Sequence, residues 1–288
     1  MSTYSDTKFN LKSTRFGDVN VPMKKFEGID FNFMPFVLDN IEEHLKYLKT
    51  GYKVRDDDIF ICTYPRSGTN WTYEIVHMLI HGSTEFAPLF SFVENFTGDV
   101  LEKRDSPRLL CSHLLPRMLP DELGYKGKII VVVRNPKDVA VSVHNFLKIP
   151  CNSWFDYVQA WEKEQKDHPK KSILTLCFED MKRNLKQNVQ KIAEFLGVPR
   201  DESLISNITE KCDFASINKE KTTNVPPVVS KLSRNCPNFL YRKGQIGDWK
   251  NWFTVAQNER FDAIYAERME NSDLDFEFCT KSLEKLTL

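Results

Sequence analysis

The sequence predicts a single α/β domain in which a central, largely parallel β-sheet is flanked by helices. Strand-like segments alternate with segments of helical periodicity over most of the 288 residues, as in parallel sheets with crossover helices. The clearest strand is the run KIIVVV at residues 128–133, which is almost continuously β-branched, as strands buried on both faces are. No repeat and no linker divides the chain, so we expect one domain over residues 1–288.

The individual elements follow from periodicity and turn residues. Strands are expected at residues 59–62, 108–112, 128–133 and 173–178, and helices at residues 39–49, 70–80, 136–147, 154–165, 184–196 and 256–269. Gly82 and Gly197 each end a helix. Residues 212–227 are polar and broken, and no element is expected there. Residues 1–38 predict an N-terminal arm, whose interspersed Phe residues either anchor it to the body or line an apolar pocket.

Charge and cysteine usage exclude several classes of protein. Forty Lys and Arg balance forty Asp and Glu, so no overall positive field favours nucleic acid or an anionic membrane. No apolar run approaches the roughly 20 residues of a membrane span, and the N-terminal segment lacks the apolar core of a signal peptide. Seven Cys at irregular spacing indicate reduced thiols, and the lack of C-x-x-C pairs argues against zinc. We therefore expect a cytoplasmic protein without a bound metal.

Residues 59–71 (IFICTYPRSGTNW) predict a P-loop-like strand, loop and helix that bind an anion. Ser67, Thr69 and Asn70 offer N-cap side chains, and a helix N-terminus with free amides attracts negative charge. Arg66 adds a guanidinium that fits phosphate or sulfate oxygens. The stretch lacks the G-x-x-x-x-G-K-[ST] pattern of nucleotide-hydrolysing enzymes, which argues against a P-loop phosphotransferase.

Further chemistry-bearing residues follow other predicted strands. His113 comes directly after the strand at residues 108–112, and Arg134 directly after residues 128–133. Ligands of parallel sheets bind at the carboxyl ends of the strands, so we expect both side chains to meet Arg66 in one crevice. The basic triplet at residues 242–244 offers two more cations beside a glycine backbone that a ligand can approach closely.

Three separated segments resemble the cytosolic sulfotransferases. Residues 63–71 (TYPRSGTNW) resemble the 5′-phosphosulfate loop of that family, residues 134–142 (RNPKDVAVS) its 3′-phosphate motif, and residues 242–254 (RKGQIGDWKNWFT) its C-terminal signature. The resemblance implies a homodimeric enzyme that moves a sulfonyl group from 3′-phosphoadenosine 5′-phosphosulfate (PAPS) to a hydroxyl or amine of a small acceptor, leaving PAP. It also implies dimer contacts through residues 250–259, which match the dimerisation motif of the family between Lys250 and Glu259.

The resemblance also assigns roles by position. His113 is the expected general base, and Arg66 is expected to act on the reacting group. The residues expected to bind the nucleotide are Arg66, Ser67, Gly68, Thr69, Asn70, Trp71, Arg134, Ser142, Phe178, Cys212, Phe214, Arg242, Lys243 and Gly244. Trp71 and Phe214 are expected to enclose the adenine. The Phe-rich stretch at residues 86–96 indicates an apolar acceptor, and the expected pocket residues are Phe90, Phe92, Phe96, Cys111, His113 and Phe146.

Several positions differ from the family pattern. Arg66 stands where the family usually has Lys, Asn70 where it has Thr, and Cys111 where a Lys usually precedes the base by two residues. Phe178 replaces a common Tyr, and Cys212 replaces a Thr. The segment at residues 147–153 is also shorter than usual by about a helix. These differences fall on nucleotide and sulfonyl contacts, so a PAP- or PAPS-binding protein with little catalysis is the alternative.

Overall fold

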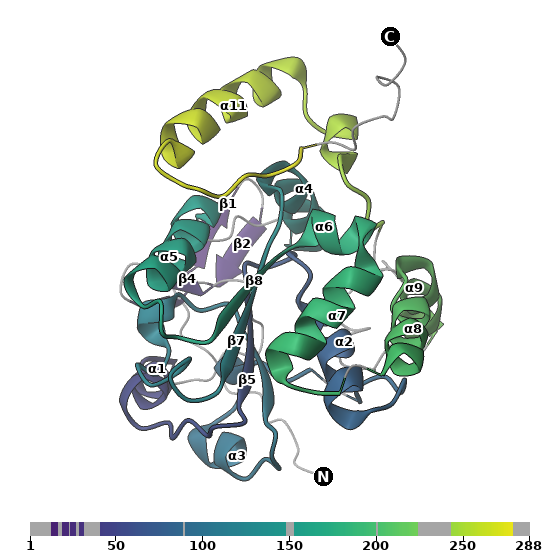
Figure 1. Ribbon diagram of the computed structural model, residues 1–288. Helices are drawn as coiled ribbons and strands as arrows, with labels where there is room; N and C mark the ends of the chain where they lie inside the picture. Colours follow the sequence, from purple (N-terminus) through teal and green to yellow (C-terminus); the bar gives the residue numbers. More distant parts are fainter. Residues whose placement is uncertain are drawn as a thin grey trace.

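The computed structural model has a four-stranded parallel sheet at its centre, with strand order β6-β5-β7-β8 (Figure 1). It describes residues 13–16, 19–22, 24–26, 29–31, 41–88, 90–147, 153–199, 201–223 and 243–278. The strands of this sheet are β5 (Ile59–Thr63), β6 (Leu109–Ser112), β7 (Lys128–Val133) and β8 (Ile173–Cys177). The predicted α/β fold with a parallel sheet is confirmed.

Helices cover both faces of the sheet, as Figure 1 shows. The helices are α1 (Ile41–Thr50), α2 (Thr69–His81), α3 (Gly98–Glu102), α4 (Pro136–Leu147), α5 (Trp154–Asp167), α6 (Phe178–Arg183), α7 (Leu185–Leu196), α8 (Glu202–Lys211), α9 (Phe214–Thr223) and α11 (Val255–Met269). Three short 3₁₀ helices are η1 (Val93–Asn95), η2 (Pro116–Met118) and η3 (Asp248–Asn251).

Two hydrophobic clusters lie on opposite faces because successive strand residues point to opposite sides. Phe60 and Cys62 of β5 join the cluster with α1 and α5, whereas Ile59 and Ile61 join the cluster with α2, α7 and α8. Every residue of β5 is buried, which the apolar run from Ile59 to Cys62 predicts for a central strand. The sheet is therefore packed against helices on both of its faces.

Two short antiparallel hairpins form within the predicted N-terminal arm. They pair β1 (Ser13–Phe16) with β2 (Val19–Pro22) and β3 (Lys24–Phe26) with β4 (Ile29–Phe31). The proposed roles of the Phe side chains in this arm lie outside what the structure describes.

Three predictions on local structure were wrong. Phe178 is the first residue of α6 and does not belong to β8, and that short helix was not expected. Residues 212–227 were expected to be irregular, but α9 occupies Phe214–Thr223. The amphipathic pattern of α9 is weak because, among the side chains of α9 that the structure describes, only the hydrophobic side chain of Ile217 is fully buried.

Candidate active site

The strand order creates a crevice at the carboxyl end of β5. The chain leaves β5 for β6 on one side and then crosses to β7 on the other side, so neighbouring loops diverge at β5. Cys62 lies opposite Ser112, and Thr63 lies opposite Val132. The residues that follow these strands therefore emerge at one edge of the sheet, where the loop at residues 64–68 meets the segments that start at His113 and Arg134.

The turn between β5 and α2 has an unusual backbone that exposes amide groups. Arg66 and Gly68 adopt positive φ angles of 70° and 112°. A Cβ atom at Gly68 would lie 3.0 Å from the ring of Phe178, so a larger residue is disfavoured. The expected side-chain cap from Ser67, Thr69 or Asn70 is absent, because Gly68 itself is the N-cap and no side chain bonds there. The first amides of α2 therefore remain available to an anion.

Ser67 supplies a polar atom inside this turn. Its side chain is fully buried, and its Oγ has no hydrogen-bond partner within the described part of the chain. Buried hydroxyls are normally satisfied, so a lone Oγ beside helix amides is a feature that an anionic ligand would explain. Thr69 is already engaged, since its Oγ1 lies 2.6 Å from Oγ1 of Thr63.

Two arginines connect this turn to α4. Arg134 Nη1 donates to the main-chain oxygen of Arg66 at 2.8 Å and so stabilises the positive φ there. Arg66 Nε in turn donates to Ser142 Oγ at 3.1 Å. The guanidinium of Arg134 also lies 4.2 Å above the Phe178 ring. Arg66, Arg134 and Ser142 thus form one basic cluster, in which the side chain of Arg66 is directed toward α4.

His113 is held in the form that a general base requires. Its Nδ1 lies 2.7 Å from the carbonyl oxygen of Thr63, and since a carbonyl only accepts, Nδ1 carries the proton and Nε2 keeps a lone pair. Burial, together with the positive charge of Arg66, lowers the pKa of His113 to about 4, although the bond to Thr63 acts in the opposite direction. The imidazole is therefore neutral near neutral pH and able to accept a proton.

Two aromatic residues expected to contact the nucleotide form a packed wall next to the turn. Trp71 and Phe178 meet edge to face with ring centroids 5.4 Å apart. Trp71 Nε1 donates to the carbonyl of Cys212 at 2.8 Å. The sulfur of Cys212 points into the core, 3.7 Å from the sulfur of Met78. The Cys212 side chain is therefore directed away from the expected adenine. Its main chain instead fixes Trp71.

The C-terminal basic segment reaches the same wall. Gly244 has a φ of +58°, and a Cβ atom there would lie 2.2 Å from the Phe214 ring, so only glycine permits this approach. Lys243 forms an ion pair with Asp248 at 2.8 Å. Arg242 lies outside the described residues. The acidic side chain that brings this segment to α4 is Asp138, which accepts from the amides of Gly247 and Trp249 at 2.7 and 2.9 Å.

The expected aromatic pocket is only partly assembled. The Phe92 ring lies 4.9 Å from the His113 ring, and Phe90 packs on Tyr73 of α2. Phe96 instead packs against the cluster on the opposite face of the sheet, under the guanidinium of Arg104. Cys111 is fully buried in the core, so it cannot line an open pocket. The side chain of Phe146 and residues 148–152 lie outside the described residues. Of the expected pocket residues, the structure therefore places Phe92 against His113, whereas Phe96 packs on the other face of the sheet and Cys111 lies in the core.

Sequence reasoning missed three polar residues that shape the site. Thr63 orients His113, Asp138 holds the C-terminal segment, and Glu94 accepts hydrogen bonds from the main chain at His113. Asp138 lies within the quoted RNPKDVAVS stretch, one helical turn before Ser142, and that spacing was the available signal. No periodicity marks Thr63 or Glu94, because each acts across strands that are distant in sequence.

No group of three His, Cys, Asp or Glu side chains among the described residues is arranged to hold a metal ion. None of the helices there combines the length and apolarity needed to cross a membrane.

Comparisons with known proteins all lead to one family. The profile of the sulfotransferase domain matches residues 56–273. Sulfotransferase 1A1 of the rat (Rattus norvegicus) is 36% identical over 258 residues, covering 77% of this chain and 87% of the relative. Sulfotransferase 1B1 of the dog (Canis lupus familiaris) is 35% identical over 259 residues, covering 77% and 86%. The crystal structure of mouse sulfotransferase SULT7A1 complexed with PAP superposes with a TM-score of 0.70 at 30% identity, covering 87% of this chain and 96% of that one.

Proposed function

The chain belongs to the sulfotransferase family, and from that premise we propose that it transfers a sulfonyl group from PAPS to a hydroxyl or amine of a small, largely apolar acceptor. The observation that carries this proposal is His113, a neutral imidazole whose Nδ1 is bonded to Thr63, beside a turn rich in amide groups and arginine. A relative of known structure is complexed with PAP, which supports the choice of nucleotide.

The residues present fit a nucleotide with two anionic ends. The lone Oγ of Ser67, the amides of α2 and Arg66 would hold the 5′-phosphosulfate. Arg134 and Ser142 would hold the 3′-phosphate, together with the segment at residues 242–244. The remaining proposed contacts are Gly68, Thr69, Asn70, Trp71, Phe178 and Phe214, with Cys212 acting through its carbonyl. PAPS supplies the activated sulfonyl group when bound, and no metal is needed in this proposal.

Each catalytic residue has a distinct task. His113 Nε2 accepts the proton of the acceptor hydroxyl, which is too weak an acid to lose it unaided. Thr63 keeps that nitrogen unprotonated by accepting from Nδ1. Arg66 and the amides of the turn present positive charge where negative charge grows on the leaving phosphate. These donors are fixed before the reaction, because Arg134 and Gly68 hold the turn in place.

An apolar acceptor is supported by the Phe92 ring beside His113. Phe92 is partly buried and packs against the cluster that includes Trp71 and Phe178. Phe90 extends the same apolar surface toward α2. We therefore propose that a flat, apolar group of the acceptor lies against Phe92 while its hydroxyl or amine meets Nε2 of His113.

The alternative is a protein that binds PAP or PAPS with little transfer, and two observations favour it. Arg66 is bonded to Ser142, on the side of the proposed 3′-phosphate site. Cys111 is buried and uncharged, so it adds no cation next to His113. If Arg66 stays on Ser142, the reacting group is stabilised mainly by amides.

We also propose a cytoplasmic homodimer in which the whole chain, residues 1–288, acts as one unit with a terminal arm. The proposed dimer contact is the segment between Lys250 and Glu259, and it includes Val255, which is 76% exposed. Trp252, in the same segment, is also exposed. Exposed apolar side chains on one surface are typical of protein contacts.

The test is transfer from labelled PAPS to a panel of phenols, steroids, alcohols and amines. We expect His113→Ala to lower kcat on the order of 100-fold or more, because it removes the proton acceptor, while PAP binding measured by calorimetry stays unchanged. The matched control is His168→Ala, which removes a histidine at the exposed end of α5. PAP binding by the wild type without transfer to any acceptor would establish the alternative.

A further inference from the structure

A buried carboxyl, that of Glu94, holds the main chain that carries His113. We infer that Glu94 is a positioning residue for the transfer reaction, which fixes the imidazole of His113 without touching the substrate. This inference rests on the function proposed above, because the position of His113 matters only if His113 accepts the proton.

The contacts of Glu94 converge on three consecutive residues. Its Oε1 accepts from the amide of His113 at 2.5 Å and from Ser112 Oγ at 2.9 Å. Ser112 Oγ also accepts from the amide of Leu114 at 3.0 Å. One carboxyl oxygen therefore organises the turn after β6, and removing it would leave a buried amide and a buried hydroxyl without their acceptor.

Glu94 can act as a clamp because η1, which carries it, is itself anchored. Nε2 of His44 in α1 lies 2.7 Å from the carbonyl oxygen of Val93. The amide of Cys111 donates to the carbonyl of Ser91 at 2.7 Å, which adds this segment to the edge of the sheet at β6. Phe92, next in sequence, packs against the ring of His113. The same short segment thus holds the main chain of His113 and one face of its ring.

The environment of Glu94 makes its charge sensitive to pH. The residue is 1% exposed, and its Oε2 has no hydrogen-bond partner within the described residues. The titratable groups that act on it from β5, β6 and α5 are Cys62, Cys111 and Tyr157, and burial raises the pKa of each, so they stay neutral. Burial lowers the pKa of His44 and of His113, so both are uncharged as well.

Burial raises the pKa of Glu94 itself to about 7, despite the opposing hydrogen bond from His113. An ionised carboxylate is a stronger acceptor than the neutral acid. The hold on the turn at His113 therefore tightens as the pH rises through about 7.

The test compares Glu94→Ala, Glu94→Gln and the control Glu74→Ala by kcat, KM for PAPS and the pH profile. Glu74 of α2 is also fully buried, and it accepts from the amide of a different loop, that of Ala87 at 2.8 Å. We expect Glu94→Ala to lose kcat on the order of 10- to 100-fold at unchanged PAP affinity, since a small displacement of a base costs this much. Glu94→Gln keeps an acceptor oxygen, so kcat should stay within about threefold of wild type.

The pH profile separates positioning from simple structural support. We expect the kcat of the wild type to rise through about pH 7, and we expect Glu94→Gln to lack this inflection because an amide does not titrate. An inflection that persists in Glu94→Gln, or an equal loss of kcat in Glu74→Ala, would overturn the inference. If Glu94→Ala does not fold, the profile of Glu94→Gln alone decides.

Failure of the proposed function would be recognised separately. If the wild type transfers no sulfonyl group, the imidazole proton on Nδ1 of His113 can still be followed by NMR, with His113→Ala to assign it. We expect this signal to be lost or shifted in Glu94→Ala and kept in Glu94→Gln and Glu74→Ala. An unchanged signal in Glu94→Ala would refute the clamp whatever the reaction is.

Discussion

Arg66 combines a positive charge with a backbone conformation that costs free energy. A left-handed φ of 70° is unfavourable for a residue with a Cβ atom by about 1–2 kcal/mol. The donation from Arg134 Nη1 to its carbonyl and its own bond to Ser142 offset this cost. The result is a guanidinium with a fixed direction, and its planar fork is suited to anionic oxygens. The identity of this residue should therefore affect nucleotide binding more than stability.

Replacing Arg66 by Lys tests this expectation. Lys has no donor at the position of Nε, so the bond to Ser142 is lost while the charge remains. We expect PAP affinity to fall roughly tenfold and the melting temperature to change little. Calorimetry and thermal unfolding measure both, with the exposed Arg260→Lys on α11 as the control. Equal PAP affinity of Arg66→Lys and wild type would contradict the assigned role.

The buried carboxyl of Glu94 makes stability depend on pH. Burial raises its pKa from 4.5 to about 7, so the folded state holds the proton more tightly than the unfolded chain does. The contribution of protonated Glu94 to the free energy of unfolding is therefore complete below about pH 4.5, and it is lost as the pH rises through about 7. Between about pH 5 and pH 8 we expect wild type to lose about 2–3 kcal/mol more free energy of unfolding than Glu94→Gln. Urea denaturation at both pH values measures this difference, and parallel curves for the two proteins would refute it.

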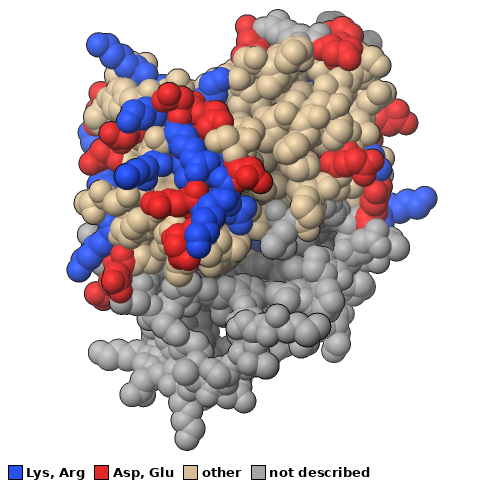
Figure 2. All heavy atoms as spheres, turned by 90° about the horizontal axis from the view of Figure 1, so that it is seen from below, with Lys and Arg blue, Asp and Glu red and all other residues tan. Residues whose placement is uncertain are grey.

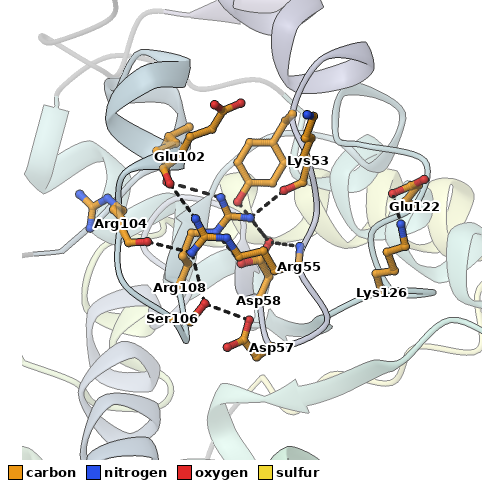
Figure 3. A network of polar contacts seen from close by, with 12 residues as sticks. Lys53, Arg55, Asp57, Asp58, Glu102, Arg104, Ser106, Arg108, Glu122 and Lys126 are labelled. Atoms are coloured by element: carbon orange, nitrogen blue, oxygen red, sulfur yellow. Dashed lines mark hydrogen bonds and ion pairs between the residues drawn. The ribbon is translucent and has the colours of Figure 1, made fainter.

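The two ends of the sheet have different tasks. The carboxyl end carries the candidate site, whereas the amino end holds a buried network that joins β5 to β6 (Figure 3). Arg108 donates to both oxygens of Asp58 at 2.6 and 2.5 Å, and both side chains are almost fully buried. Tyr52 and the amide of Arg55 also donate to Asp58. This network fixes the starts of β5 and β6 relative to each other. It thereby also fixes the relative positions of Thr63 and His113 at the carboxyl ends of these strands.

Breaking the Asp58–Arg108 pair should destabilise the protein strongly. In Asp58→Asn the guanidinium of Arg108 remains buried without its counter-charge, which typically costs about 3–5 kcal/mol. Chemical denaturation measures the loss. The control is Asp167→Asn, because the Lys163–Asp167 pair is exposed on α5 and should leave the denaturation midpoint unchanged. A midpoint of Asp58→Asn close to that of wild type would show that the network is dispensable.

The described surface carries mixed charges and, near the start of α11, exposed apolar side chains. Lys and Arg are interspersed with Asp and Glu on the face that Figure 2 shows, in line with equal numbers of both signs in the sequence. α11 lies at the end of the molecule near α4 and α5 (Figure 1). Its first residue, Val255, is exposed, as is Trp252 three residues earlier. This region is the best supported candidate for contact with a second copy.

Placing a charge in this region tests the proposed homodimer. We expect Val255→Glu to turn a dimer into a monomer, since a buried carboxylate without a partner opposes association. Light scattering coupled to gel filtration measures the mass. The control is Ala263→Glu, which changes another exposed residue of α11 two turns further on. A wild type that is monomeric at micromolar concentration would refute the dimer itself.

The sequence by itself determined the strands of the central sheet, most of the longer helices and the chemical groups of this protein. The bounds of β7, the helix end at Gly197 and the succession of strand, turn and helix around residues 63–71 follow from burial, turn and capping preferences, which are local properties. α9 was missed for the same reason, because few of its side chains are buried and its pattern is faint.

Only the tertiary structure decided how these groups act on one another. The order β6-β5-β7-β8 brings His113, Arg66 and Arg134 to one edge, although the intervening chain gives no local sign of it. In the folded chain, Arg66 also bonds to Ser142, Cys111 is buried, and Glu94 lies against the amide of His113. Such contacts join residues far apart in sequence, and their geometry depends on strand order and register, which no single segment encodes.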